Sequence, residues 1–157
     1  MSDPQKIMLL LCTGNTCRSP LAEALLKDAI KTSPSLSHIQ VQSAGIFAQL
    51  NGKASENAQE AIKDYNLSLG SHRSQPLTQE LINRSFIILG MTASHINQLS
   101  CQFDSLPENL FRFREWTDDT QKDIIDPYGC NLDLYKECAQ TIKEAIPSII
   151  SYLESRN

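Results

Sequence analysis

Residues 12–20 read Cys-Thr-Gly-Asn-Thr-Cys-Arg-Ser-Pro and lie between two segments of different hydrophobic periodicity. They follow a continuous apolar run, residues 7–11 (IMLLL), which is typical of a buried β-strand. They precede residues 21–26 (LAEALL), whose apolar spacing is helical. A short loop between a strand and a helix turns its backbone N–H groups and the helix N-terminus toward one point. The stretch therefore predicts a concave binding site for an oxyanion.

Three residues of the loop fit this backbone arrangement. Gly14 and Asn15 are expected to supply the unusual backbone angles that converging N–H groups require. Pro20 falls at an early helical position, where its missing N–H leaves no helical hydrogen bond unmade.

The side chains of the same stretch indicate what happens to the anion. Cys12 ends the predicted strand, where the loop N–H donors and the helix dipole favour the thiolate, the nucleophilic form of cysteine. Arg18 can return across the loop and bind two phosphate oxygens through its planar guanidinium. Ser19 can donate to the Cys12 sulfur and stabilise it as attacking and leaving group. These residues predict phosphoryl transfer to Cys12, although a cysteine at a strand end is also a common core residue.

Attack by a thiolate on phosphorus also requires a proton donor for the leaving atom. Residues 126–129 (DPYG) place the carboxyl of Asp126 before a proline that stiffens the chain and a glycine that permits a turn. About ten loop residues, at ~3.3 Å each, separate Asp126 from the last predicted strand and can span the sheet edge. The poorer candidates, because no proline follows them, are Asp118, Asp119 and Asp123.

Strand and helix patterns alternate along the whole chain. The predicted strands are residues 7–11, 38–44, 86–91 and 109–113, and the predicted helices are residues 19–31, 55–65, 78–84, 92–99 and 132–154. This order predicts an α/β fold, a three-layer α/β/α sandwich with a four-stranded parallel sheet and right-handed crossovers. Ligands of such sheets bind beyond the carboxyl ends of the strands, where the predicted loop lies.

Two helices carry more detailed expectations. The helix that begins at Thr92 places His95 near its start, where we expect it to be exposed to solvent. The last helix is expected to kink at Pro147. Its inward-facing residues are expected to be Leu134, Cys138, Ile142, Ile146 and Ile149.

Composition limits the classes of protein to consider. A chain of 157 residues with 41% hydrophobic residues predicts one domain, residues 1–157, and its net charge of −4 argues against nucleic acid or an anionic membrane as main partner. No apolar segment is long enough to span a bilayer. Asp3 and Pro4 precede an apolar run that is too short for a signal peptide.

The cysteines carry separate expectations about location and redox chemistry. Five cysteines without paired spacing predict reduced thiols in a cytoplasm rather than a disulfide framework or a zinc site. Cys12 and Cys17 are close enough in a curled loop to form a reversible disulfide under oxidation.

Residues 12–23 (CTGNTCRSPLAE) resemble the phosphate-binding loop of the low-molecular-weight protein-tyrosine phosphatase family, and other matches extend over nearly the whole chain. The resemblance implies a cysteine-dependent protein phosphatase that forms a phosphocysteine and releases inorganic phosphate from phosphorylated proteins, without metal or cofactor. It implies catalytic roles for Cys12, Arg18 and Asp126. The substrate-binding residues that it implies are Thr13, Gly14, Asn15, Thr16, Cys17, Ser19, Phe47 and Tyr128.

The resemblance also implies a network of residues behind the loop. Ser43 is expected to hold Asn15 in its strained conformation, and His72 is expected to join the same network. Each has a plainer interpretation from the sequence alone, Ser43 as a strand end and His72 as a surface loop residue. Cys17 fits a buried helix start equally well.

Within the family, Thr16 bears on the substrate. Tyrosine phosphatases usually carry a branched apolar residue at this place, whereas the bacterial protein-arginine phosphatases carry threonine. Residues 43–48 (SAGIFA) and 51–54 (NGKA) also resemble the arginine-specific branch. Gly129 follows Tyr128 directly, where many tyrosine phosphatases have a second aromatic residue. We therefore expect phosphoarginine as the substrate, with phosphotyrosine as the alternative.

Two other functions are compatible with parts of the pattern. Arsenate reductases on the same fold share the Cys-x5-Arg loop but need a resolving pair of cysteines past mid-chain, where Cys101 stands alone and Cys130 is far along. An inactive anion-binding module would not need Cys12, Arg18 and Asp126 together.

Overall fold

The computed structural model of the chain describes residues 6–156. Its strands are β1 (Lys6–Cys12), β2 (Ile39–Gly45), β3 (Ser85–Gly90) and β4 (Leu110–Arg112). All three pairings are parallel and the strand order is β2-β1-β3-β4, which confirms the predicted four-stranded parallel sheet. The expectation about Asp3 and Pro4 concerns residues that lie outside the described range.

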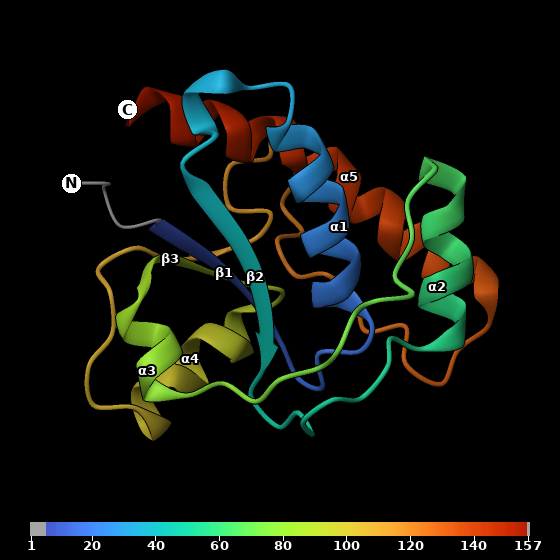
Figure 1. Ribbon diagram of the computed structural model, residues 1–157, viewed down its shortest axis with the longest axis horizontal. Helices are drawn as coiled ribbons and strands as arrows, with labels where there is room; N and C mark the ends of the chain where they lie inside the picture. Colours follow the sequence, from blue (N-terminus) through green and yellow to red (C-terminus); the bar gives the residue numbers. More distant parts are fainter. Residues whose placement is uncertain (1–5, 157) are drawn as a thin grey trace.

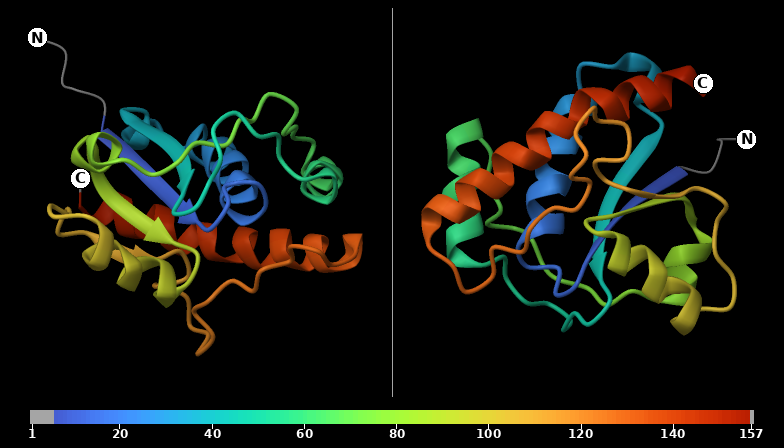
Figure 2. Two further views of the ribbon diagram at one scale, coloured as in Figure 1. Left: turned by 90° about the horizontal axis from the view of Figure 1, so that it is seen from below. Right: turned by 180° about the vertical axis from the view of Figure 1, so that it is seen from behind.

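Within residues 6–156, five α-helices and two short 3-10 helices lie between these strands or after the last of them. They are α1 (Arg18–Ile30), η1 (Pro34–Leu36), α2 (Glu56–Ile62), η2 (Lys63–Tyr65), α3 (Gln79–Asn83), α4 (Ala93–Gln102) and α5 (Leu132–Ser155). Helices α1 and α5 lie on one face of the sheet, with α2 packed against them, and α3 and α4 lie on the other face (Figures 1 and 2). The chain thus has the expected α/β fold, with helices on both faces of the sheet.

Strand β1 is buried on both faces and separates two parts of the core. Met8 and Leu10 pack with residues of α1, α2 and α5, whereas Ile7, Leu9 and Leu11 pack with residues of α3 and α4. A strand whose alternate side chains are fixed on both sides has little freedom, so Cys12 at its carboxyl end is held firmly.

The ends of the strands define where a ligand site can form. After β1 the chain goes to β2 on one side, and it later returns to β3 on the other side of β1. The strand order therefore reverses at the carboxyl end of β1, where parallel α/β sheets place their ligands. The loop of residues 13–17 begins there.

Predicted caps account for several helix starts. The hydroxyl of Ser55 accepts the N–H of Ala58 at the start of α2, and that of Thr78 accepts the N–H of Leu81 at the start of α3. Each satisfies one of the N–H groups that a helix N-terminus leaves free. The sequence therefore locates these helix starts to within a residue.

Helix α5 differs from expectation at one position. Cys138, Ile142, Ile146 and Ile149 are buried as predicted, but Leu134 is 43% exposed. Tyr135 occupies the inward position instead, and adjacent helical residues point about 100° apart. The helix continues through Pro147, and the kink there stays a prediction. Among residues 6–156, no helix is both long and apolar enough to cross a membrane.

Candidate active site

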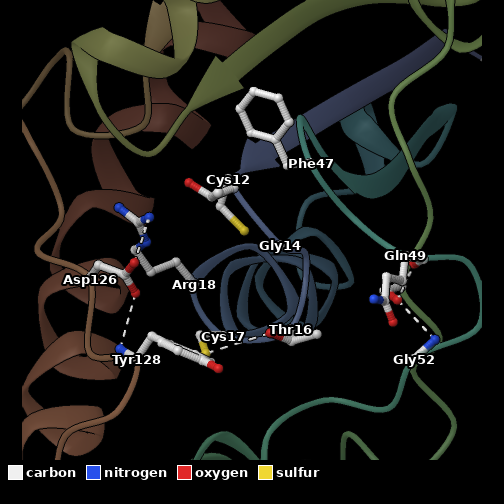
Figure 3. A pocket seen from close by; sticks show the side chains of 12 residues that line it. Cys12, Gly14, Thr16, Cys17, Arg18, Phe47, Gln49, Gly52, Asp126 and Tyr128 are labelled. Atoms are coloured by element: carbon white, nitrogen blue, oxygen red, sulfur yellow. Dashed lines mark hydrogen bonds and ion pairs between the residues drawn. The ribbon is translucent and has the colours of Figure 1, made fainter.

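A pocket of about 430 Å³ opens at the carboxyl edge of the sheet, between the loop after β1 and the loop after β4 (Figure 3). Its walls combine predicted and unpredicted residues: Cys12, Thr13, Gly14, Thr16, Cys17, Arg18, Phe47, Gln49, Gly52, Ser74, Asp126 and Tyr128. All three predicted catalytic side chains thus face one pocket, although they come from positions far apart in the sequence.

The sulfur of Cys12 lies within the loop and is surrounded by hydrogen-bond donors. The backbone N–H of Asn15 donates to it at 3.2 Å, and the Ser19 hydroxyl lies 2.9 Å away. Because Ser19 Oγ already accepts from the Asn15 amide at 2.8 Å, its own hydrogen is free to point at the sulfur. Cys12 is only 3% exposed but forms part of the pocket wall, so a ligand in the pocket reaches it. Such donors stabilise a thiolate.

Arg18 and Asp126 meet across the pocket. Arg18 is buried, and its Nη1 donates to the carbonyl oxygen of Ile124 at 2.9 Å. Its Nη2 lies 3.4 Å from Oδ2 of Asp126, whose side chain is 50% exposed. The other carboxylate oxygen accepts the N–H of Tyr128 at 3.0 Å, as is usual for an Asp that opens a turn. The loop after β4 is thereby fastened to the start of α1.

Asn15 is the most heavily bonded residue of the loop. It adopts a left-handed backbone conformation, with φ of 56°. Its amide donates to Ser19 and to Ser43, at 2.8 and 2.9 Å, and its Oδ1 accepts the N–H of Gln75 at 3.0 Å. Nε2 of His72 donates to its backbone carbonyl at 2.8 Å. Ser43 and His72 therefore both bond to Asn15, and these hydrogen bonds offset the cost of its strained backbone.

Two glycines near the loop differ in their roles. Gly14 was expected to share the unusual backbone angles, but in the loop of residues 13–17 only Asn15 has a positive φ. At Gly45, by contrast, a Cβ would lie 2.6 Å from the backbone oxygen of Thr13 and 2.9 Å from the backbone nitrogen of Asn15. The end of β2 approaches the loop so closely that only glycine fits there.

Cys17 is both a pocket residue and a packed helix start. Its sulfur lies 3.2 Å from the hydroxyl of Tyr135 on α5 and donates to Ser55 at 3.5 Å. Burial, followed by the hydrogen bond to Cys17, raises the pKa of Tyr135 to about 12. All five cysteines are free thiols, so the disulfide between Cys12 and Cys17 stays a prediction.

Aromatic side chains stand on opposite sides of the pocket mouth. Phe47, from the loop after β2, is 68% exposed, and Tyr128, beside Asp126, is 74% exposed. Figure 3 shows the two rings on either side of Cys12, in the positions expected of pocket walls. Large apolar rings left in solvent are typical of a surface that contacts a partner.

His95 contradicts the expectation of a solvent-exposed residue. It is 4% exposed and forms a capping box with Thr92 at the start of α4. Its Nε2 lies 2.9 Å from Oγ1 of Thr13 in the pocket wall. Burial, and secondarily the charge of Arg18, lowers the pKa of His95 to about 4. The pattern Thr-x-x-His after a predicted strand is the signal that could have indicated the cap, but not the contact with Thr13.

Sequence reasoning also missed the residue that supports the Asp126 loop. Arg114 is buried and bridges this loop to α5, donating to the carbonyl oxygens of Gln121 at 3.3 Å and Thr141 at 2.7 Å. It also pairs with Asp119. Nothing in the surrounding sequence separates it from the surface arginines. Gln49 and Ser74 complete the pocket wall without a recognisable motif, and Gly52 belongs to the segment 51–54 noted above but was not singled out as a site residue. Within residues 6–156, no cluster of three or more His, Cys, Asp or Glu side chains could hold a metal ion.

A comparison with protein families assigns the chain to a class. The family described as "Low molecular weight phosphotyrosine protein phosphatase" matches residues 7–157. The chain therefore belongs to the low-molecular-weight phosphotyrosine protein phosphatase family.

Individual relatives include enzymes named for two different substrates. A protein-arginine-phosphatase of Bacillus subtilis is 37% identical over 147 residues, which cover 94% of this chain and 96% of the relative. A probable low molecular weight protein-tyrosine-phosphatase, EpsP of Ralstonia solanacearum, is 33% identical over 90% of this chain and 91% of the relative. A solved structure of the arginine phosphatase YwlE, in a cysteine-to-serine variant with a phosphorylated active-site serine, superposes with a TM-score of 0.86. It shares 34% identity and covers 94% of this chain and 95% of its own.

Proposed function

We propose that this protein hydrolyses phosphoarginine in proteins through a phosphocysteine on Cys12. The observation that carries the proposal is that Cys12, Arg18 and Asp126 face one pocket, with the sulfur among donors and the carboxyl within 3.4 Å of the guanidinium. These are the parts that a metal-independent double displacement requires: a nucleophile, a cationic clamp and an acid.

In the first step, the Cys12 thiolate attacks phosphorus from the floor of the pocket. The S–P bond forms while the bond from phosphorus to the guanidino nitrogen of the substrate breaks. Asp126 supplies the proton that this nitrogen collects. Arg18 and the loop N–H groups bind the phosphoryl oxygens, on which negative charge accumulates in the transition state.

In the second step, water replaces the departed arginine. Asp126, now a carboxylate, takes a proton from the water as its oxygen bonds to phosphorus. The S–P bond breaks, inorganic phosphate is released, and the electron pair returns to Cys12. Ser19 and the N–H of Asn15 stabilise the departing thiolate through the contacts described above. Because Arg18 and the loop amides neutralise the oxyanion, neither step uses a metal or cofactor.

The substrate class rests on the pocket wall as well as on relatives. Thr16 places a small polar side chain in the wall, where a branched apolar residue would crowd a guanidino group and offer it no hydrogen bond. The named activity of the Bacillus subtilis relative supports phosphoarginine. Phosphotyrosine is the second candidate, because the exposed rings of Phe47 and Tyr128 suit a phenol ring equally well.

We further infer that residues 1–157 form one phosphatase domain that works in a cytoplasm on phosphorylated proteins. The family match over residues 7–157 supports the first point, and the five unpaired thiols support a reducing compartment. The net charge of −4 argues against nucleic acid or an anionic membrane as partner.

The test compares kcat/KM for two peptides of equal sequence context, one carrying phosphoarginine and one phosphotyrosine. The wild type is expected to prefer phosphoarginine, and Thr16→Ile is expected to shift the ratio toward phosphotyrosine. Thr16→Val, which keeps the volume but removes the hydroxyl, separates a hydrogen bond from a steric effect. A wild type that prefers phosphotyrosine would overturn the arginine assignment, and one that hydrolyses neither peptide would overturn the phosphatase proposal.

A further inference from the structure

His95 is a buried polar residue that the proposed reaction does not use directly. It lies at the start of α4, on the face of the sheet opposite to α1, yet its ring reaches the phosphate-binding loop. The hydrogen bonds of its two ring nitrogens determine where its proton resides. That position in turn determines how the ring interacts with Thr13.

One ring nitrogen acts as an acceptor. The backbone N–H of Thr92 donates to Nδ1 at 3.2 Å, as part of the capping box. A backbone N–H cannot accept, so Nδ1 carries no proton while this bond exists. The Thr92 hydroxyl, 3.1 Å from the same nitrogen, already accepts the backbone N–H of His95, so its own hydrogen can also point at Nδ1. Neutral His95 must therefore hold its proton on Nε2, and a second proton on Nδ1 would oppose the Thr92 N–H.

The other ring nitrogen is then a donor. Nε2 lies 2.9 Å from Oγ1 of Thr13, so the ring donates and the Thr13 hydroxyl accepts. A hydroxyl that accepts from one partner keeps one hydrogen to donate elsewhere. Thr13 is part of the pocket wall, and phosphoryl oxygens are strong acceptors. The Ser19 hydroxyl is arranged in the same way: it accepts a hydrogen bond from Asn15, so its own hydrogen can be donated to the nearby Cys12 sulfur.

We propose that His95 is a positioning residue: by donating to Thr13 from Nε2, it directs the Thr13 hydroxyl into the pocket as a hydrogen-bond donor to the substrate's phosphoryl group. The inference rests on the proposed phosphatase function and adds a residue from the opposite side of the sheet to the site. It concerns the shared phosphoryl group, so it applies to phosphoarginine and phosphotyrosine alike.

Two substitutions at His95 separate this role from capping. The amide of Asn takes the place of Nδ1, so His95→Asn keeps an acceptor for the Thr92 N–H but has no donor near Thr13. The longer Gln places its amide near the position of Nε2, so His95→Gln keeps a donor for Thr13 and loses the cap acceptor. A capping role and a positioning role therefore predict opposite orders of activity for the two variants.

The measurements are kcat/KM for a phosphorylated peptide and inhibition by inorganic phosphate. For His95→Asn we expect kcat/KM to fall about tenfold, as for loss of one charge-assisted hydrogen bond, and phosphate inhibition to weaken in parallel. His95→Gln is expected to recover most of both. Thr13→Val is expected to show the same loss as His95→Asn, and adding His95→Asn to Thr13→Val should cost little more.

Thermal unfolding of each variant checks that it is folded. The inference is overturned if the folded His95→Asn variant equals the wild type in both measurements, or if His95→Asn is more active than His95→Gln. It is also overturned if the losses of kcat/KM in Thr13→Val and His95→Asn multiply in the double variant. A wild type without phosphatase activity would instead overturn the proposed function. Phosphate binding, measured by calorimetry on the same variants, would then still test the contact between Thr13 and the anion.

Discussion

The guanidinium of Arg18 and the carboxylate of Asp126 lie 3.4 Å apart, so the proposed phosphate clamp and the proposed acid contact each other. The Arg18 side chain is buried but that of Asp126 is half-exposed, so water can solvate the carboxylate when it leaves the guanidinium. A phosphoryl group would bind the same guanidinium by shorter, charge-assisted hydrogen bonds. Substrate can therefore displace Asp126 from Arg18 at little cost and leave the carboxyl beside the leaving atom.

This relationship predicts that Asp126→Asn loses activity in a way that depends on the leaving group. We expect kcat/KM, which reports the steps up to release of the first product, to fall about 10²- to 10⁴-fold for a phosphopeptide whose leaving atom needs a proton. The loss should be smaller for an aryl phosphate whose leaving group is stable as an anion. Steady-state kinetics on both substrates measure the difference, with exposed Asp118→Asn of the same loop as the control. Equal losses on both substrates would remove Asp126 as the acid.

The hydrogen bond between Ser19 and Cys12 predicts a specific kinetic defect. Ser19→Ala removes a donor to the thiolate that leaves in the second step, so hydrolysis of the phosphocysteine should slow about tenfold or more. Stopped-flow measurements should then show a larger burst of the first product before a slower steady state. Ser85→Ala is a matched control, since Ser85 is also buried but bonds to Leu81 away from the pocket. A lower kcat without a larger burst would assign Ser19 to the first step instead.

The hydrogen bonds and the left-handed backbone of Asn15 both predict a loss of stability on substitution. Comparing Asn15→Ala with Asn15→Gly separates the two contributions. Asn15→Ala removes the hydrogen bonds to Ser43 and Gln75 and places alanine at φ of 56°. We expect the free energy of unfolding to fall by about 3 kcal/mol. Asn15→Gly loses the same bonds but tolerates the backbone, so it should be about 1 kcal/mol more stable than Asn15→Ala. Equal stabilities in urea unfolding would show that the backbone conformation carries no strain.

The lowered pKa of His95 predicts how stability depends on pH. Its pKa is about 4 in the folded chain, against an ordinary value of 6.5. Between these values the unfolded chain binds a proton that the folded chain does not, so stability falls as pH decreases through this window. Above pH 6.5 and below pH 4 this contribution is constant.

The difference of 2.5 pH units corresponds to about 3 kcal/mol between the two ends of the window. Urea unfolding of the wild type and of His95→Gln across pH 4 to 7 measures it. The difference in unfolding free energy between the two proteins should shrink as pH decreases. If it stays constant across this range, His95 titrates equally in both states and its burial has been assigned wrongly.

The sequence predicts the positions of residues that local preferences determine, and it fails for residues whose positions depend on contacts with distant parts of the chain. The β1 run and the loop to Pro20 are encoded locally, by a continuous apolar segment and by residues with particular backbone preferences. The loop places its left-handed conformation at Asn15 alone, because side-chain contacts with Ser43 and Gln75 hold it there. Gly14 has no side chain to make such contacts, and the sequence alone does not show which of the two residues takes the left-handed conformation.

His95 and Leu134 show where tertiary contacts decide. A histidine three residues into a helix has the same local pattern whether it faces water or a neighbouring loop, and only the parallel sheet brings α4 beside Thr13. Leu134 follows the helical pattern almost as well as Tyr135, but only Tyr135 is buried, where its hydroxyl meets the sulfur of Cys17. Which of two neighbouring helical residues is buried thus depends on the surface against which the helix packs, and the helix's own sequence does not contain that surface.

The central claim is that Cys12 carries the phosphoryl group during turnover. The most direct measurement is acid quenching of Asp126→Asn during turnover of an aryl phosphate that is labelled on phosphorus and whose leaving group needs no proton, followed by peptide mapping of the enzyme. With this substrate, loss of the base should slow hydrolysis of the intermediate more than its formation. We predict label on the peptide that contains Cys12, and none in the same experiment with Cys12→Ala combined with Asp126→Asn, because alanine offers no nucleophile. Label on another side chain, or wild-type turnover retained by Cys12→Ser, would contradict the account.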